Sequence, residues 1–374
     1  MAEKANYRQT FYASARRRGS VVVRLALLLF LVYLFILSIS LLGSAFKLFG
    51  KDFADTIFQA TSNPLVGLMI GILATAVIQS SSTTTSLIVG LVATQSLSFE
   101  SSIAMVMGAN IGTSVTNTIV SLGHISRGEE FKRAFAGAML HDFFNVCSVI
   151  TLLPLQVKFN VIGRSARYLE SVFAGFGGLQ FSSPLKAITK PVAGQVVALT
   201  GDSGWLTAAI SFVLLFAALR YIVKVLKSMV LARVEKFFQR YIFRTPVLSL
   251  LLGTILTALV QSSSITTSMV VPLVGAGVIS LTQIYPYLLG ANVGTTITAF
   301  LASFVTGSHE AVAVAFGHLL FNVFGMAIFW PLRQVPIWMA VTLSKITLKS
   351  RLYPILYILI AFFIIPGMVI YFFN

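Results

Sequence analysis

The nine residues Ile78–Ser86 read IQSSSTTTS, and Val260–Ser268 repeat the pattern as VQSSSITTS. Each polar run interrupts an apolar stretch, and this interruption decides the fold. The apolar piece before the first run, Leu65–Ile78, covers about 21 Å as a helix, less than the roughly 30 Å of a membrane core. A second short apolar piece, Leu87–Ala93, follows the run. Two half-helices around a polar tip predict a re-entrant hairpin, because non-helical backbone at membrane depth is tolerated only under cover of protein or water.

The composition of the whole chain is that of a membrane protein. Of its 374 residues, 57% are hydrophobic and only 10% are charged, whereas soluble globular proteins carry about 25% charged residues. Its apolar stretches are continuous rather than alternating, which excludes a β-barrel and predicts spanning helices. The net charge of +16 sits in short basic segments between these stretches. We therefore expect a cytoplasmic location for those segments and no nucleic-acid partner.

The two polar runs belong to a longer internal repeat. Residues 64–116 match residues 246–298 at a constant offset, so that each begins with a proline and ends with a threonine. Three expected spans separate the two runs, near residues 103–122, 134–155 and 205–227. An odd number of crossings turns the second copy upside down, and inverted repeats are typical of secondary transporters.

The predicted fold is an all-α polytopic membrane protein with inverted structural repeats. Each repeat has a re-entrant helical hairpin with a Gln-Ser-Ser-Ser tip and a discontinuous helix. We expect the cell inner (plasma) membrane, with the N-terminus in the cytoplasm. The expected segments are a cytoplasmic segment 1–24; a first repeat 25–157 with hairpin 64–94 and spans 101–122 and 132–157; an external loop 158–204 with interfacial helices; a second repeat 205–332 with hairpin 246–278 and spans 284–306 and 310–332; a basic cytoplasmic segment 333–351; and a C-terminal span 352–374.

The tips of the hairpins have the chemistry of an anion site. Serine and threonine are favoured helix N-caps, so the returning half-helices should begin within Ser81–Thr84 and Ser263–Thr266. Free N–H groups and the positive dipole end of a helix attract anions, and hydroxyls add donors without charge. An anion held without lysine or arginine needs a co-bound cation such as sodium. Its oxygen ligands would come from Gln79, Asn110, Thr113, Gln261, Asn292 and Thr295.

Several of these residues also have a structural interpretation. Small and hydroxyl residues in membrane helices more often serve packing than binding, although a duplicated seven-residue polar run favours a site. Asp142 inside a span is functional by default, or it pairs with Arg133 near the interface. Cys147 is expected in the core. The remaining supporting residues fit an inter-helix hydrogen-bond brace as well as a ligand set: His141, Asn145, His318 and Asn322.

Four further stretches carry a family resemblance. They are GANIGTSVTNTI at 108–119, FKRAFAGAMLHDFFN at 131–145, ITKP at 188–191 and GANVGTT at 290–296. With both polar runs, they make the chain similar to the type II sodium-dependent phosphate cotransporters, in a bacterial form, over nearly the whole length from Pro64.

The resemblance implies sodium-driven uptake of inorganic phosphate by alternating access, in a protein that is usually a homodimer in the lipid bilayer. Sodium is then a co-transported ion, and no organic cofactor is implied. The phosphate contacts it implies are Ser80, Ser81, Ser82, Thr83, Ser262, Ser263 and Ser264.

Three other functions fit parts of the pattern. One is a sodium-coupled carrier of another oxyanion, such as sulfate or a dicarboxylate, although a dicarboxylate carrier should show a different hairpin tip. Another is an anion channel, whose flux would not depend on a sodium gradient. The third is a membrane enzyme that uses His141, Asp142 and His318, but no nucleophile pairs with them, so we expect no enzyme activity.

Overall fold

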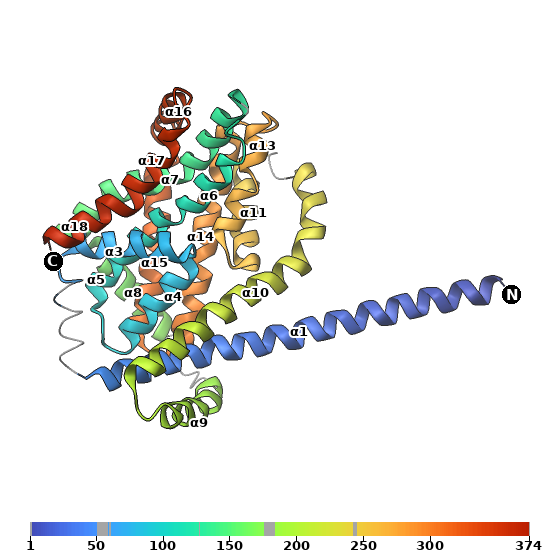
Figure 1. The fold of residues 1–374 in the computed structure, drawn as a ribbon, viewed down its shortest axis with the longest axis vertical. Coiled ribbons are helices and arrows are strands. Elements are labelled where there is room, and N and C mark those ends of the chain that lie inside the picture. Colours follow the sequence, from blue (N-terminus) through green and yellow to red (C-terminus); the bar gives the residue numbers. More distant parts are fainter. Residues whose placement is uncertain are drawn as a thin grey trace.

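The computed structural model describes residues 2–50, 59, 61–126, 128–175, 184–241 and 245–373, and their side chains except at 2–22, 184–187, 223 and 226–241. The secondary structure in these ranges is helical, as predicted (Figure 1). Part of the expected external loop, 176–183, lies outside the described residues. The side chains of the basic residues at 16–18 and 227–244, which support the expected orientation, also lie outside them.

The helices follow one another in two similar halves joined by a connecting segment. The first half contains α1 (Ala2–Phe49), α3 (Pro64–Ile78), α4 (Ser81–Ala93), α5 (Phe99–Gly112), α6 (Ser114–Leu122) and α7 (Glu129–Phe159). The connecting segment contains α8 (Val161–Gly175) and α9 (Pro184–Leu199). The second half contains α10 (Gly204–Tyr241), α11 (Pro246–Val260), α12 (Ser263–Ser268), α13 (Val271–Gly275), α14 (Leu281–Thr306) and α15 (His309–Phe329). The C-terminal part contains α16 (Gln334–Thr347), α17 (Leu352–Leu359), the π-helix η1 (Ile360–Ile364) and α18 (Ile365–Phe373).

Seven of the described helices are long and apolar enough to cross a membrane. Three of them, Phe99–Leu122, Glu129–Phe159 and Gly204–Ile222, lie between the two polar runs, as expected. Helices α3 and α4 have 15 and 13 residues, fewer than the about 20 that a spanning helix needs. These lengths support a multi-pass helical membrane protein, while the re-entrant insertion of the short helices stays a prediction.

The two halves differ in where a helix is interrupted. In the first half, the expected span 101–122 is divided into α5 and α6, with Thr113 between them. The corresponding stretch of the second half, α14, is one continuous helix of 26 residues. There the returning helix is interrupted instead, because α12 ends at Ser268 and α13 begins three residues later with a proline in its first turn. The duplicated sequence therefore folds with local differences.

A row of glycines brings the short helices against their neighbours at backbone distance. A Cβ atom at Gly71 or Gly108 would overlap backbone carbonyl groups across the contact between α3 and α5. Gly253 and Gly290, which occupy the equivalent positions of the second repeat, make the same close contact between α11 and α14. Close approach through small residues is how membrane helices gain packing energy without a hydrophobic driving force. The first short helix of each repeat, α3 or α11, is thereby fixed to the neighbouring candidate span.

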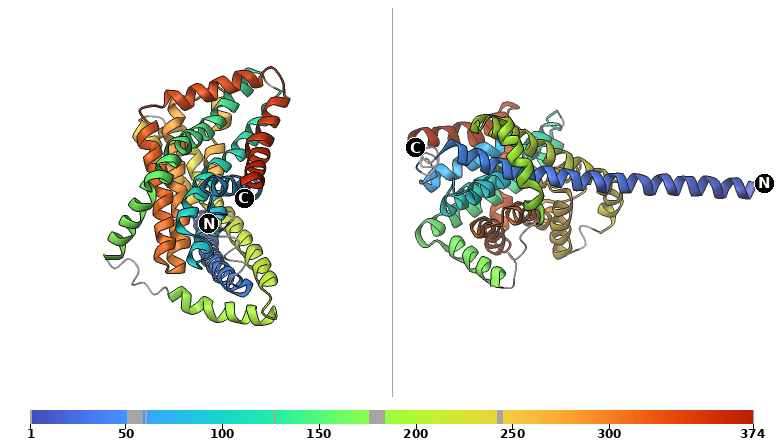
Figure 2. Two further views of the ribbon diagram at one scale, coloured as in Figure 1. Left: turned by 90° about the vertical axis from the view of Figure 1, so that its left-hand side faces the viewer. Right: turned by 90° about the horizontal axis from the view of Figure 1, so that it is seen from below.

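The long helices arrange these two units around one another. Helix α14 of the second half packs against α4 of the first, and α7 contacts helices of both halves. Helices α1 and α10 lie side by side along one flank of the bundle, with α9 crossing near the Phe49 end of α1 (Figures 1 and 2). The C-terminal helix α18 packs against α3. The helical part of the first polar run, Ser81–Ser86, is therefore buried inside the bundle, as are Ser263 and Ser264 of the second. Gln79 is exposed, and Ser80, Gln261 and Ser262 are half-buried.

The glycine contacts predict a strong effect of a single methyl group. Gly108→Ala and Gly290→Ala should each destabilise the protein by about 1–3 kcal/mol, because overpacked contacts force backbone shifts. Thermal unfolding of the purified protein, followed by size-exclusion chromatography, measures the loss. Gly367→Ala in α18 is the matched control, because a Cβ there meets nothing within 4 Å. An unchanged unfolding temperature in the first two variants would contradict the backbone contact.

Candidate functional site

The two polar runs adopt the same local conformation. The residue that follows α3 as its C-cap is Gln79, with φ 57°, and the C-cap of α11 is Gln261, with φ 55°. Both glutamines therefore lie in the left-handed region. The residue after each glutamine is the N-cap of the next helix, with φ and ψ of −155° and 101° at Ser80 and −155° and 104° at Ser262. The returning helices begin at Ser81 and Ser263, which confirms the predicted start windows.

The serine N-caps satisfy part of the exposed backbone at each helix start. The Ser80 hydroxyl accepts a hydrogen bond from the Thr83 N–H at 3.3 Å, and the Ser262 hydroxyl accepts one from the Ile265 N–H at 3.4 Å. The remaining N–H groups of the first turn have no partner within the helix. Each tip therefore presents backbone donors and the positive end of a helix dipole.

Both glutamine side chains are held in equivalent positions. Each amide nitrogen donates back into its own helix, to the carbonyl of Ala76 or Ala258, at 2.5 Å in both cases. The side-chain amide oxygen of Gln79 accepts a hydrogen bond from the Thr116 hydroxyl at 2.9 Å. The side-chain amide oxygen of Gln261 accepts one from the Thr298 hydroxyl at 2.8 Å. Their remaining lone pairs leave the amide oxygens able to coordinate a cation.

The two tips approach each other across the interface of the halves. The Ser82 hydroxyl donates to the backbone carbonyl of Gln261 at 3.2 Å, and the Thr298 hydroxyl lies 3.5 Å from that of Ser82. Helix α12 makes a second connection, because the Thr267 hydroxyl donates to the Asn117 amide oxygen at 2.9 Å. Ser82, predicted as a phosphate contact, thus lies against Gln261, predicted as a sodium ligand, from about half the chain away.

Histidine and asparagine side chains form a buried network that crosses between the halves. His141 of α7 hydrogen-bonds the Asn292 amide oxygen at 2.6 Å, and His318 of α15 lies 3.4 Å from the Asn110 amide oxygen. Asn145 joins the two sides, because it accepts from Asn292 at 2.7 Å and donates to the Asn110 carbonyl at 3.2 Å. These contacts fit an inter-helix hydrogen-bond brace. The sequence allowed this interpretation of the histidines and asparagines as well as that of a ligand set.

The remaining predicted residues lie close to this network and are buried. The hydroxyls of Thr113 and Thr295 donate to carbonyls one turn earlier in their own helices, each at 2.9 Å. A hydroxyl that donates in this way keeps its lone pairs, so it can still coordinate a cation. Asn322 donates to the His318 carbonyl at 3.0 Å. Among the buried polar side chains in the described ranges there is no lysine or arginine.

The duplicated site is not fully symmetric. Thr267 has Asn117 as its partner, but the residue equivalent to Asn117 in the second repeat is Ala299. The Thr85 hydroxyl, which is equivalent to that of Thr267, is accordingly buried with no hydrogen-bond partner among the described residues. A buried hydroxyl without a partner costs free energy, so the first tip keeps an unused donor that the second tip does not have.

Asp142 has a partner that the sequence did not predict. The carboxylate is 1% exposed, and the Tyr357 hydroxyl of α17 donates to its Oδ2 atom. Arg133, considered as its partner, instead donates to the Gly275 carbonyl at 2.8 Å. Because Tyr357 is distant in the chain and belongs to neither repeat, no periodicity or motif linked it to Asp142. Cys147 is buried, as expected.

Comparison with known proteins gives a consistent result. Residues 34–183 and 214–343 match the family model described as Na+/Pi-cotransporter. The sodium-dependent phosphate transport protein 2A of Ovis aries is 34% identical over 436 aligned positions, which cover 95% of this chain and 68% of that protein. The sodium-dependent phosphate transport protein 2B of Homo sapiens is 32% identical over 442 positions, which cover 92% and 64%. No solved structure matches the chain.

The contact between Tyr357 and Asp142 predicts a stability effect of a substitution in α17. Tyr357→Phe removes the donor to a buried carboxylate, so it should destabilise the protein by about 1–3 kcal/mol and lower the thermal unfolding temperature. Tyr353→Phe is the matched control, one turn away on the same helix, because Tyr353 is 42% exposed. Equal unfolding temperatures for the two variants would show that the hydroxyl of Tyr357 contributes nothing.

Proposed function

Because the chain belongs to the Na+/Pi-cotransporter family, whose model matches residues 34–183 and 214–343, we propose that it imports inorganic phosphate together with sodium across the cell membrane. The observation that carries this proposal is the meeting of two identical helix starts. Ser80 and Ser262 cap helices in the same backbone conformation, and Ser82 reaches the carbonyl of Gln261. Two such helix starts offer N–H and O–H donors from two directions to one tetrahedral oxyanion.

The proposed phosphate contacts come from both tips. They are Ser80, Ser81, Ser82 and Thr83 in the first tip and Ser262, Ser263 and Ser264 in the second. Hydroxyl and N–H donors bind an oxyanion without the fixed charge of lysine or arginine. A transporter must release its substrate, and uncharged donors hold phosphate firmly only while a cation balances its charge.

Sodium is the proposed balancing cation. Oxygen atoms surround the tips on both sides, from amides and hydroxyls whose hydrogen bonds leave lone pairs unused. In transporters with broken helices, such oxygens and freed backbone carbonyls coordinate sodium near the substrate. The proposed ligands are Gln79, Asn110, Thr113, Gln261, Asn292 and Thr295, with His141, Asp142, Asn145, His318 and Asn322 as support.

Alternating access would follow from the arrangement of the repeats. We infer that the two halves are inverted, because three candidate spans separate the two polar runs and an odd number reverses direction. The site would then lie where two oppositely oriented re-entrant hairpins meet. The histidine network crosses the same interface, so rocking of one half against the other would have to rearrange its hydrogen bonds.

The membrane, the oligomeric state and the orientation of the protein are also part of the proposal. We propose that it resides in the inner membrane of the cell as a homodimer. Its N-terminus would lie in the cytoplasm, because Arg16, Arg17 and Arg18 precede the candidate span that begins at Val23. The Phe49 end of α1 would then face outward. We propose no enzyme activity, because the buried polar groups fit binding rather than nucleophilic chemistry.

Transport itself is testable in proteoliposomes. Vesicles that contain the purified protein should accumulate labelled phosphate when an inward sodium gradient is imposed, and choline in place of sodium should abolish the accumulation. Labelled sulfate and succinate, tested under the same gradient, separate phosphate import from transport of another oxyanion. Phosphate flux of equal size in sodium and in choline would contradict coupling and indicate a channel.

The role of the glutamines is testable by substitution. Gln79→Ala and Gln261→Ala should each reduce sodium-driven phosphate uptake to the background, with little loss of expression, because each removes an amide oxygen beside a tip. Gln95→Ala is the matched control, since Gln95 also lies in the left-handed region, with φ 61°, but follows the C-cap of α4 at the end of that helix away from the tip. Wild-type uptake in the first two variants would show that these glutamines only cap helices.

A further inference from the structure

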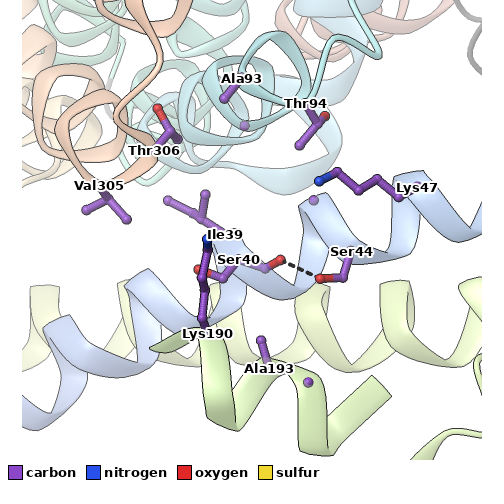
Figure 3. Close-up of a pocket in the computed structure, with 13 residues that line it drawn as sticks. Ile39, Ser40, Ser44, Lys47, Ala93, Thr94, Lys190, Ala193, Val305 and Thr306 are labelled. Carbon is purple, nitrogen blue, oxygen red and sulfur yellow. Dashed lines mark hydrogen bonds between the residues drawn. The ribbon is translucent and has the colours of Figure 1, made fainter. Parts of the chain in front are cut away.

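A cavity lies away from the tips, at the Phe49 end of α1. It has a volume of about 510 Å³ and lies between α1 and α9 on one side and the ends of α4 and α14 on the other. Figure 3 shows that its lining includes two lysines, Lys47 of α1 and Lys190 of α9. We call it the α1–α9 cavity. None of the residues proposed above for phosphate or sodium lines it.

The two lysines give the α1–α9 cavity a positive charge. Their side chains reach into it from different helices (Figure 3). The lining contains no aspartate or glutamate, and neither lysine forms an ion pair with a described acidic residue. Two ammonium groups that share one partly enclosed space repel each other, and an anion between them removes that repulsion.

The position of Lys190 is set by its neighbour in the chain. Thr189 is fully buried, and its hydroxyl lies 3.4 Å from that of Ser40 on α1. This contact fixes α9 against α1 and places the next residue, Lys190, at the wall of the cavity. Both residues belong to the ITKP stretch, which the proposed transport mechanism does not use.

The rest of the lining is small or carries a hydroxyl group. Gly43, Gly90 and Gly194 leave room between the helices, and Cβ at Gly194 would meet nothing within 4 Å. The hydroxyls of Ser44, Thr94 and Thr306 donate to carbonyls of their own helices. A hydroxyl hydrogen can rotate from such a carbonyl toward a bound anion, and it would then add a neutral donor beside the two ammonium groups. The hydroxyl residues of the lining are Ser40, Ser44, Thr94 and Thr306.

A helix C-terminus carries partial negative charge, and this explains only part of the lysine placement. Lys47 is in the last turn of α1, where a cation offsets the dipole of its own helix. Lys190 has no such explanation, because it lies in the interior of α9. The end of α4 is largely satisfied by its own turn, since Thr94, Gln95 and Ser96 donate to carbonyls of its last residues. Two full positive charges therefore outweigh the partial negative charges around them.

An exposed tryptophan beside the Phe49 end of α1 favours a position of the cavity at the level of the lipid headgroups. At the same end of α1, the ring of Phe49 packs on that of Trp205, with centroids 4.8 Å apart. Trp205 begins the candidate span of α10 and is 73% exposed. Exposed tryptophan at the end of a span marks the level of the lipid headgroups, and Lys47 is two residues from that end.

We propose that the α1–α9 cavity is a second oxyanion site that binds a phosphate group through Lys47 and Lys190. Phosphate is the suitable ligand because its oxygens accept several hydrogen bonds and its charge matches two ammonium groups. The group has two sources at this depth, free inorganic phosphate and the phosphodiester of an anionic lipid. Either source places the same chemistry between the same two side chains.

Direct binding to the full-length protein tests the proposal in a neutral detergent, with choline in place of sodium. Equilibrium dialysis measures retained labelled inorganic phosphate, and native mass spectrometry counts bound phosphatidylglycerol, with phosphatidylcholine as the neutral-headgroup comparison. We expect binding of at least one of the two anionic probes. The double variant Lys47→Gln/Lys190→Gln should weaken it by about tenfold or more, because two charge-assisted hydrogen bonds are lost.

Matched variants separate the cavity from general charge effects. Lys158→Gln removes the same charge from the end of α7, outside the cavity, where Lys158 lies over the ring of Phe159, and it should bind like the wild type. Lys47→Arg/Lys190→Arg should retain binding. If the double glutamine variant does not fold, Lys190→Gln alone must show the loss.

The outcome also identifies the source of the group. Retained phosphate without phosphatidylglycerol indicates a free anion, and the reverse indicates a lipid headgroup. Binding of neither probe, or equal binding by the wild type and the folded glutamine variant, overturns the proposal. Because no sodium gradient is present, this result is independent of whether the protein transports phosphate.

Discussion

A chain that breaks its helix within a membrane has to satisfy the freed backbone groups with its own atoms, because lipid offers none. This chain interrupts its helices twice with the same residues. Gln79 and Gln261 take the left-handed conformation that ends a helix, and their amide nitrogens donate to carbonyls of the helix that they end. The serine that follows each one caps the next helix. The N–H groups that these caps leave unpaired are the part of the backbone that can bind a ligand.

A break of this kind is stable only if its two short helices are held from outside. The glycine rows of α3 and α5, and of α11 and α14, bring backbones into contact and fix the first short helix of each repeat to the neighbouring candidate span. Thr116 and Thr298, on α6 and α14, then hold the glutamine side chains. The same packing that stabilises the interruption therefore also aims its polar groups toward the interface of the two halves.

Side-chain hydrogen bonds cross the interface between the two halves in both directions. Each histidine hydrogen-bonds an asparagine of the other half, and Asn145 contacts both asparagines. Departures from symmetry lie around this network. Thr85 lacks the partner that Thr267 has, and the Asp142 carboxylate accepts a hydrogen bond from Tyr357 of α17, outside both repeats. Duplication supplied two equal tips, and later divergence of their surroundings made the two sides chemically distinct.

Much of the fold and part of the site followed from the sequence. The apolar stretches predicted the spanning helices, and Ser81 and Ser263 fall inside the predicted start windows, because hydropathy and capping are local properties of a few neighbouring residues. The repeat identified which polar residues correspond. Only the tertiary structure showed that His141 bonds Asn292, that Tyr357 reaches Asp142, and that Lys47 and Lys190 line one cavity. These contacts depend on how distant helices pack, and no local pattern in a single sequence records which face of one helix meets which face of another.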